Sequence, residues 1–582
     1  MKFYSTTEKN ALIVISLLKA HGIRYIIASP GTTNTALIGS IQKDPFFKIF
    51  SAADERSAAY IACGLSAETG EPVVISCTGA TASRNYAPGM TEAYYRKLPV
   101  LAITSTQPMS RIGHHVAQVI DRSVISNDVA NLSVTLPVVK DEDDFWDCEI
   151  KVNQAILELT RRGGGPVHIN LPTTYSLPFT EKENINCRVL NRFTQVSELP
   201  LLDSKTRISI IIGSHHRWSE EATLAVENFC ERYNAVVFCD HTSGYKGKNR
   251  VLISLAAAQE LHSRTELKAD ITLHIGEVTG DYSLVRMAGN DVWRISPDGE
   301  IRDTFRRLRY IFEMPEISFF QYYSEQASQT STNEYFQQCT DFLKTVQNKI
   351  PSIPFSNVWL ASKLASKIPS GSAIHFGILN SLRAWNFYDL PSTVTAFSNV
   401  GGFGIDGNVS SLLGASLASP NKLYYGVIGD LAFFYDLNAI GNRHVANNLR
   451  ILLVNNGKGT EFRMYNHHAA HFNKDGDEFV AAAGHYGNKS STLIKNYAEN
   501  LGFEYFTANN KEEFETVYQR FIEPSITEKP MLFEVFTDSE DESKALQVMN
   551  KLEVSAEGKA KQTLKKVLGP KGIDTVKKLI KR

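Results

Sequence analysis

Short apolar runs alternate with amphipathic stretches along most of this chain. Residues 8–20 are typical of a helix, because their apolar positions recur at helical spacing. Several apolar runs stand beside Pro or Gly, the residues that commonly bound strands. In the first part of the chain these runs are 25–28, 72–76, 99–104 and 166–171. Strands that are apolar throughout lie in sheets covered on both faces, so the pattern predicts a buried parallel sheet.

The alternation continues in two further blocks. The second block has apolar runs at 207–213, 235–238, 271–276 and 292–295. The third block has them at 373–376, 423–428 and 450–454. Strands alternating with helices indicate α/β domains with parallel sheets. The sequence therefore predicts three consecutive doubly wound α/β domains, at 1–185, 200–330 and 350–545, of which the second is a small Rossmann-like domain. A tail at 546–582 follows them.

The segments between and after these blocks have a different character. Residues 186–205 are less patterned and are interpreted as a linker, and a polar stretch at 326–334 separates the second block from the third. Residues 558–582 contain nine Lys or Arg and one Asp, with apolar residues at helical spacing. Such a basic amphipathic helix can lie on a membrane or a partner. A solvated surface helix or a frayed end is the preferred interpretation.

The composition narrows the function classes. Apolar residues make up 43% of the chain, as in a protein with packed cores. The 61 Lys and Arg nearly balance the 62 Asp and Glu, so there is no overall attraction to nucleic acid. Seven scattered cysteines without a CxxC pair argue against disulfides or structural zinc. The early apolar run at 11–18 is too short to span a membrane. We expect a soluble cytoplasmic protein.

The third block contains the strongest chemical signal. Gly429-Asp430 and Asn455-Asn456 each follow an apolar run, with a stretch that predicts a helix, 435–445, between them. Parallel strands end at one edge of a sheet, where a carboxylate and an amide can hold Mg²⁺ and its phosphate ligands. The glycine-rich segment 401–407 offers backbone N–H groups to a phosphate. Each motif alone is common in loops, but together they favour a diphosphate site.

These motifs resemble those of thiamine-diphosphate (ThDP) enzymes of the acetolactate synthase and pyruvate decarboxylase type. The resemblance extends over about 540 of the 582 residues. In the first block the segments 53–59, 77–82 and 165–172 fall in the order found in the pyrimidine-binding domain of that family. The resemblance implies a pyrimidine-binding domain, a central domain and a diphosphate-binding domain.

The resemblance also implies roles for individual residues. Glu55 matches the glutamate that activates the cofactor through its aminopyrimidine ring. Asp430, Asn456 and the backbone carbonyl of Lys458 match the Mg²⁺ ligands, and Ile405 matches the apolar residue that holds the cofactor bent. The implied cofactor contacts are Asn380, Ser381, Gly404, Ile405, Asp406, Gly429, Asp430, Leu431 and Asn456. For the Asp-Glu-Arg sequence around Glu55, a surface salt bridge is the alternative explanation.

Within the family, the motifs are most similar to menaquinone-pathway synthases, which join a decarboxylated 2-oxoglutarate unit to isochorismate. Segments 404–410 and 454–459 resemble that subfamily, as does Ala117-Gln118, where Gln118 is a candidate catalytic residue. Three departures concern arginines that hold substrate carboxylates. Thr33 and the Val of Asn399-Val400-Gly401 stand in place of two of them, and the third aligns near Trp385, with Arg383 two residues away. We therefore expect an altered substrate pocket.

Histidines and other arginines supply further candidates. His114 and His115 lie where pyruvate-decarboxylase-like relatives have a His-His pair that handles protons, so either is a catalytic candidate or a loop residue. Three histidines follow the Asn-Asn motif, in a segment that is mobile in the family, and a metal site there is the less favoured alternative. These are His467, His468 and His471. Three arginines could bind a substrate carboxylate or phosphate, and ordinary surface ion pairing is the alternative. They are Arg111, Arg383 and Arg463.

Together these features predict a ThDP- and Mg²⁺-dependent enzyme that decarboxylates a 2-oxo acid. The product is passed to an acceptor, which we favour, or released as an aldehyde. The alternatives are the menaquinone-pathway reaction itself and a ThDP-binding subunit without turnover; nothing marks the flavin site of an acetolactate-synthase-like variant. The resemblance implies a homodimer or homotetramer whose sites combine Glu55 of one chain with Asp430 and Asn456 of another.

Overall fold

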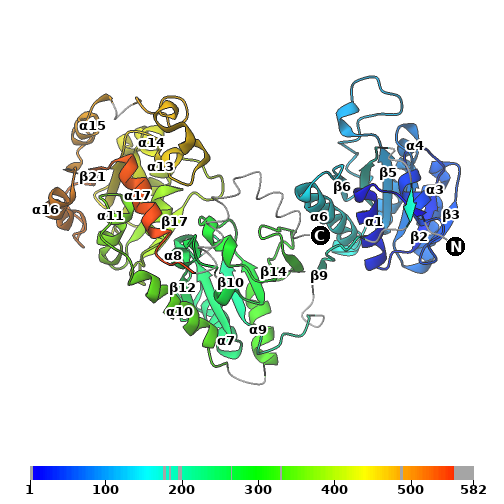
Figure 1. Cartoon of the computed structure of the whole chain (residues 1–582), viewed down its shortest axis with the longest axis horizontal. Helices are drawn as coiled ribbons and strands as arrows, with labels where there is room; N and C mark the ends of the chain where they lie inside the picture. The colour runs from blue at the N-terminus through cyan, green and yellow to red at the C-terminus, as the bar shows by residue number, and fades with distance from the viewer. Residues whose placement is uncertain are drawn as a thin grey trace. The chain divides into compact units, whose positions relative to one another are not determined.

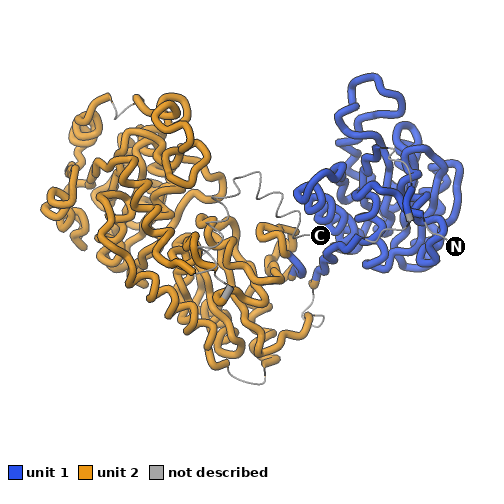
Figure 2. Tube along the Cα trace, in the orientation of Figure 1, with its two compact units in different colours: residues 1–192, 308–311 blue, residues 193–307, 312–582 orange. Residues whose placement is uncertain are grey.

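The computed structural model describes residues 4–174, 179–181, 185–194, 199–215, 217–263, 265–327, 331–485 and 489–555. The basic segment 558–582, for which the sequence predicts a helix, lies outside these residues. The chain divides into two compact units (Figure 2). They consist of Met1–Arg192 with Leu308–Ile311 and of Phe193–Arg307 with Phe312–Arg582.

Unit 1 contains a six-stranded sheet in the order β3-β2-β4-β5-β7-β6, with every neighbouring pair parallel. Its strands are β2 (Tyr25–Ala28), β3 (Lys48–Ser51), β4 (Val73–Cys77), β5 (Val100–Thr106), β6 (Leu132–Thr135) and β7 (Val167–Pro172). The four predicted strands are β2, β4, β5 and β7. The two edge strands lack an apolar run because they are only partly buried. A short antiparallel pair, β1 (Tyr4–Ser5) with β8 (Thr180–Glu181), completes the unit.

Helices cover both faces of this sheet (Figure 1). They are α1 (Lys9–Ala20), α2 (Thr35–Ile41), α3 (Glu55–Thr69), α4 (Thr81–Asn85), α5 (Ala87–Arg96) and α6 (Glu142–Glu158). Side chains alternate along each strand, so Ile26 and Val74 pack with α1 and α6, whereas Ile27 and Ile75 pack with α3 and α5. Two apolar cores, one on each face, hold the sheet.

Unit 2 contains the other two sheets. The central sheet includes five parallel strands in the order β12-β11-β10-β13-β14. These are β10 (Ile208–Ile212), β11 (Ala235–Cys239), β12 (Arg250–Leu252), β13 (Ile271–Ile275) and β14 (Asp291–Ile295). The helices of this region are α7 (Glu220–Arg232), α8 (Ser254–Ala258), α9 (Glu316–Gln326) and α10 (Glu334–Gln347). The division between the units passes through β9 (Asn191–Phe193) and β15 (Leu308–Phe312).

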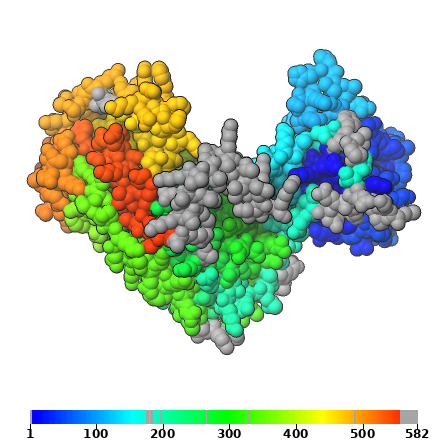
Figure 3. Space-filling view, in the orientation of Figure 1, coloured from blue at the N-terminus to red at the C-terminus, as the bar shows by residue number. Residues whose placement is uncertain are grey.

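The third sheet has the order β17-β16-β18-β19-β21-β20 and is parallel throughout. Its strands are β16 (Ala373–Phe376), β17 (Thr395–Ser398), β18 (Tyr424–Gly429), β19 (Leu449–Asn455), β20 (Glu504–Ala508) and β21 (Met531–Phe536). Its helices are α11 (Asn357–Leu364), α12 (Asn380–Trp385), α13 (Asn408–Ser416), α14 (Asp430–Tyr435), α15 (Leu493–Asn500), α16 (Lys511–Phe521) and α17 (Ser539–Met549). Figure 3 shows α17, in red, at the surface beside α11, which it contacts.

Three parallel sheets with helices on their faces confirm the predicted doubly wound α/β architecture. The predicted helix at 8–20 corresponds to α1. The predicted helix at 435–445 is wrong: α14 begins at Asp430, directly after β18, and a 3₁₀ turn at Leu437–Gly441 follows it. The break lies at Asp436, whose carboxylate bonds to Ser410 instead. Within the described residues, every helix is too short or too polar to cross a bilayer.

Candidate active site

The third sheet brings Asp430 and Asn456 to the same edge. Strands β18 and β19 are parallel neighbours, with Gly429 opposite Val454. Asp430 begins α14 immediately after β18, and Asn456 follows the last residue of β19. Asn380 begins α12 shortly after β16, the other neighbour of β18. The carboxyl ends of three adjacent strands thus supply the polar side chains that the sequence motifs predict at this edge.

Asp430 has the properties of a cation ligand. It is 5% exposed, and the backbone N–H groups of Leu431 and Gly457 bond to its carboxyl group. Burial raises the pKa of Asp430 to about 7, and the negative charge of Glu534 adds to this effect. No Lys or Arg among the described residues forms an ion pair with Asp430. A divalent cation would supply the missing positive charge, so the site fits Mg²⁺.

The loop after β19 is held in place by its own hydrogen bonds. Thr460 Oγ1 donates to Asn456 Oδ1 at 2.6 Å. Asn455 Nδ2 donates to Glu534 Oε1 at 2.7 Å, which anchors the loop to β21. The side chain of Lys458 binds Asp477 at 2.7 Å, and therefore only its backbone carbonyl suits the predicted role in metal binding. Arg463 also pairs with Asp477, at 3.4 Å, so Arg463 is not a free anion-binding group.

The glycine-rich loop leads from β17 into α13. Ile405 is half-buried against the apolar core beneath β18, and its carbonyl accepts a bond from Asn408 Nδ2 at 3.0 Å. Gly404 cannot be replaced without movement, because an added Cβ would lie 2.4 Å from Oδ1 of the exposed Asp406. In the first turn of α13 the Ser410 N–H is already bonded, since it donates to the Asp436 carboxylate at 2.5 Å. A phosphate would have to use the other N–H groups of this turn or those of the glycine-rich loop.

Other predicted cofactor contacts line the same edge. Ser381 is buried, and its Oγ accepts a bond from Asn357 Nδ2 at 3.3 Å. Gly429 is the N-cap of α14, which leaves its backbone at the start of the helix. Leu431 packs toward the Asn-Asn loop, because a Cβ built on Gly459 would lie 3.3 Å from Leu431 Cδ1. The approach of Leu431 to Gly459 fixes the start of α14 relative to the loop after β19.

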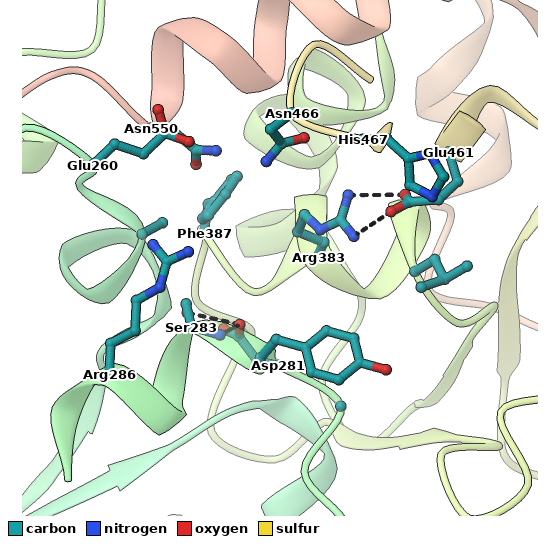
Figure 4. Close-up of a pocket in the computed structure, with 14 residues that line it drawn as sticks. Glu260, Asp281, Ser283, Arg286, Arg383, Phe387, Glu461, Asn466, His467 and Asn550 are labelled. Atoms are coloured by element: carbon teal, nitrogen blue, oxygen red, sulfur yellow. Dashed lines mark hydrogen bonds and ion pairs between the residues drawn. The ribbon is translucent and has the colours of Figure 1, made fainter. Parts of the chain in front are cut away.

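A cavity of about 210 Å³ lies near this edge, between the central and third sheets (Figure 4). Arg383 lines it, but both of its terminal nitrogens bind Glu461 at 3.0 Å, which raises the pKa of Arg383. His467 lines it as well. The sequence analysis missed Asp281 and Arg286, which reach the cavity from the central domain, where no motif marks them. Arg286 has no ion-pair partner among the described residues and is the better candidate for a substrate anion.

The histidines near this cavity do not form a metal site. Within the ranges that the structure describes, no group of three or more His, Cys, Asp or Glu side chains is arranged to hold an ion. His467 uses its Nδ1 to accept the Ala469 N–H at 3.1 Å, while His468 and His471 lie in the same 3₁₀ segment. The alternative of a metal site at these three histidines therefore has no support among the described residues.

In unit 1, Glu55 is the first residue of α3 and lies at the carboxyl edge of the first sheet. Asn85 Nδ2 donates to Glu55 Oε2 at 3.4 Å. The surface salt bridge that was the alternative explanation forms between Asp54 and Arg56 instead, at 3.7 Å. Asp54 also caps α3 by accepting from the Arg56 N–H. The half-buried Glu55 carboxyl group therefore stays available for a ligand.

The loop after β5 holds the other predicted catalytic residues of unit 1. His114, His115 and Gln118 are all exposed, and the last two have positive φ angles of 54° and 64°. A Cβ built on Gly79 would lie 3.5 Å from the Gln118 carbonyl, which places Gln118 beside the carboxyl end of β4. Arg111 bonds to Gln107 in the same loop. The non-glycine residues at positive φ indicate a locally strained loop, as binding sites often have.

The positions that the sequence analysis compared with arginines of the resembling synthases, Thr33, Val400 and the vicinity of Trp385, hold neutral buried side chains. Thr33 is 1% exposed, and its Oγ1 lies 2.5 Å from Thr78 Oγ1 and 2.9 Å from the Ser105 carbonyl. Val400 is 2% exposed. Trp385 is fully buried and donates to Asn357 Oδ1 at 3.2 Å. None of these side chains can pair with a carboxylate, so the arginine losses seen in the sequence are not compensated at the same positions.

Comparison with known proteins adds three relatives and one family model. Residues 9–125 match the model described as the N-terminal TPP binding domain of thiamine pyrophosphate enzymes. A protein of Bacteroides fragilis is 30% identical over 562 residues, covering 93% of this chain and 98% of its own length. A protein of Phocaeicola vulgatus is 30% identical, covering 93% and 97%. One of Flavobacterium johnsoniae is 27% identical, covering 90% and 95%. All three are named 2-succinyl-5-enolpyruvyl-6-hydroxy-3-cyclohexene-1-carboxylate synthase.

Proposed function

Since the chain belongs to the family of thiamine-diphosphate-dependent enzymes that includes these synthases, we propose that it removes CO₂ from a 2-oxo acid and joins the remaining carbon unit to an acceptor. The observation that carries this proposal is the buried Asp430, next to Asn456, in a chain that also retains Glu55 at the edge of its first sheet. Bound ThDP supplies the carbon nucleophile and the electron sink for decarboxylation.

The residues of the chain have distinct tasks in this proposal. The Asp430 carboxylate, the Asn456 amide oxygen and the Lys458 carbonyl would hold Mg²⁺, and with it the diphosphate. The Glu55 carboxyl group would bond to the ring nitrogen of the aminopyrimidine and favour the imino tautomer, whose exocyclic nitrogen is a stronger base than the amino group. Ile405 would support the cofactor from its apolar side. His114 and His115 are the candidates for proton handling above the sheet edge, and Gln118 would bind substrate through its amide.

The first candidate reaction is the one that the relatives' name implies. In that reaction the donor is 2-oxoglutarate and the acceptor is isochorismate, as the sequence resemblance indicates. The extent of the similarity supports this candidate, because the relative from Bacteroides fragilis is 30% identical over 93% of this chain. Arg286, which lines the cavity without an ion-pair partner among the described residues, can take one substrate carboxylate.

A second candidate reaction uses a different donor or acceptor with fewer carboxylates. Thr33 and Val400 favour it, because each is neutral and buried where the resemblance places an arginine, and the buried Trp385 lies near the position of the third. Losing several charge-assisted bonds would weaken binding of a poly-anionic substrate by about 1.5–3 kcal/mol each. Aldehyde release without an acceptor and a ThDP-binding subunit without turnover are the remaining alternatives.

The test measures CO₂ release from a panel of 2-oxo acids with ThDP and Mg²⁺, with and without isochorismate, aldehydes or keto sugars. Release from 2-oxoglutarate that isochorismate stimulates, and that disappears in Glu55→Gln, supports the first candidate. Release from another acid identifies the second. ThDP binding without CO₂ from any acid, and without exchange of the cofactor C2 proton, contradicts turnover and leaves the non-catalytic alternative.

The assembly and the compartment are also proposals. We propose a homodimer or a dimer of dimers, with Glu55 and Asp430 of each site supplied by different subunits. We place the enzyme in the cytoplasm, because all seven cysteines are unpaired and six of them are buried, as expected in a reducing compartment.

A further inference from the structure

Arg122 is a buried cation without a counter-charge. It is 3% exposed, and its one hydrogen bond runs from Nη2 to Asn170 Oδ1 at 2.5 Å. Its Nε and Nη1 atoms are buried and have no partner, and no carboxylate forms an ion pair with it within the described residues. Removing a guanidinium from water without pairing it costs several kcal/mol. A native protein rarely leaves such a group unsatisfied, which points to a missing anionic ligand.

A small pocket adjoins Arg122. Its volume is about 80 Å³, and it lies between the α4–α5 segment and the face of the first sheet formed by β5 and β7. Ala102 and Thr104 of β5 and His168 of β7 form the floor. Arg84 supplies a second guanidinium. The remaining walls consist of apolar side chains together with two serines: Ser83, Tyr86, Ala87, Met90, Ile125, Ser126 and Val129. The pocket thus combines two cations with a mixed lining that contains no acidic side chain.

The groups that face the pocket do not neutralise it. Arg84 Nη2 donates to the backbone carbonyl of Asp121 at 2.8 Å. The Asp121 carboxylate is exposed and accepts bonds from Ser123, so it balances Arg84 from the solvent side only. His168 is neutral, because burial and the two arginines lower its pKa to about 3. Both of its ring nitrogens are occupied, by Thr104 Oγ1 at 2.7 Å and Ser133 Oγ at 2.8 Å.

We propose that this pocket is a binding site for a small carboxylate anion, held by Arg122 and Arg84. A carboxylate matches a guanidinium in shape and charge, and a short aliphatic group would contact Met90 and Val129. The volume suits a small carboxylate such as formate or acetate. The pocket shares no lining residue with the cavity of about 210 Å³, and none of the predicted cofactor contacts lines it. It adjoins Glu55 in unit 1, because Asn85, which donates to Glu55, lies between the lining residues Arg84 and Tyr86.

The site would also stabilise the loop that precedes it. Arg122 lies four residues after Gln118, in the same connection between β5 and β6 that carries His114 and His115. Arg84 already bonds to this connection through Asp121. An anion that joins Arg84 and Arg122 would therefore link the loop to α4 at a second point. The binding of the anion does not depend on the proposed catalytic function.

The first experiment measures thermal unfolding of the full chain in chloride-free buffer, with acetate or formate increased at constant ionic strength. Saturable binding should raise the melting temperature by about 2–4 °C. Arg122→Met, which keeps the stem but removes the charge, should abolish the rise. The matched control is Arg96→Gln, an exposed arginine of α5 paired with Glu92, and it should leave the rise intact. No saturable rise, or an equal rise in Arg122→Met, would overturn the proposal.

A second measurement covers the case in which Arg122→Met does not fold. Crystals of the native protein with sodium bromide would show an anomalous peak beside Arg122, and crystals grown with acetate would show planar density there. A bromide peak without any effect of acetate on unfolding would overturn the carboxylate assignment. Density for a carboxylate of a neighbouring subunit in the pocket would overturn it as well, because the counter-charge would then come from the protein.

Discussion

Arg383 and Glu461 form a two-bond ion pair in the wall of the larger cavity, with Nη1–Oε2 and Nη2–Oε1 distances both of 3.0 Å. Arg383 lies on α12 and Glu461 lies in the loop after β19. The pair therefore connects α12, which begins at Asn380, to the loop that carries Asn456, and it removes Arg383 from the cations available to a substrate.

The first prediction concerns this pair. Arg383→Met should lower the free energy of unfolding by about 1–3 kcal/mol, because it leaves the carboxylate of Glu461 largely buried and unpaired. The double variant Arg383→Met/Glu461→Gln should recover part of that loss. Denaturant unfolding of the native protein, both single variants and the double variant gives the coupling energy. A coupling near zero would show that the pair does not hold the loops together.

The second prediction concerns the metal site. Asp430→Asn should weaken Mg²⁺-dependent binding of ThDP by about 10–100-fold, since it removes the anionic ligand. Adding a chelator to the native protein should have a similar effect. Calorimetric titration with ThDP at fixed Mg²⁺ measures the change, and Glu512→Gln, an exposed residue of α16, is the control. Unchanged ThDP affinity in Asp430→Asn would exclude this aspartate as a metal ligand.

The third prediction is a pH dependence of stability. Glu542 of α17 is buried, and burial raises its pKa to about 7, while it accepts bonds from the Asn357 N–H and Thr537 Oγ1. Because its pKa is higher in the folded than in the unfolded state, its contribution to stability is present below about pH 4.3 and is lost as the pH rises to about 7. Glu542→Gln should therefore reduce the fall in melting temperature between pH 5 and 8.

The matched control for this pH effect is Glu540→Gln, because Glu540 lies on the same helix but is exposed. It should keep the pH dependence of the native protein. Across this window the loss from Glu542 is on the order of 2–3 kcal/mol. Equal slopes for the native protein and Glu542→Gln would contradict the raised pKa.

The fourth prediction tests whether two subunits share each site. Glu55→Gln and Asp430→Asn should each be inactive alone. If a site takes Glu55 from one subunit and Asp430 from the other, mixed dimers contain one intact site, and random mixing should restore about one quarter of the native activity. Co-refolding the two variants in equal amounts and measuring CO₂ release gives the result. No recovery in verified mixed dimers would mean that both residues of a site come from one chain.

The sequence predicted some elements better than others for physical reasons. Strands buried on both faces, such as β4 and β19, are recognisable because each contains a run of apolar residues. The edge strands β3 and β6 have no such pattern, since one side of each meets solvent. The helix predicted after Gly429-Asp430 was misplaced because Asp436 bonds to Ser410, a residue 26 positions earlier. Local periodicity contains no information about such a bond.

The sequence by itself indicated that Asp430 and Asn456 would lie at one edge of a sheet, because neighbouring parallel strands end at the same edge whatever the packing around them. The roles of Asn380 and Glu55 came only from the family resemblance, since no local pattern marks the edge strand before Glu55. Only the tertiary structure decided which charges are paired. Glu461 neutralises Arg383, whereas Arg286 and Arg122 have no ion-pair partner within the described part of the chain. The charge state of a side chain depends on burial and on partners far away in sequence, and these are fixed only when the chain is packed.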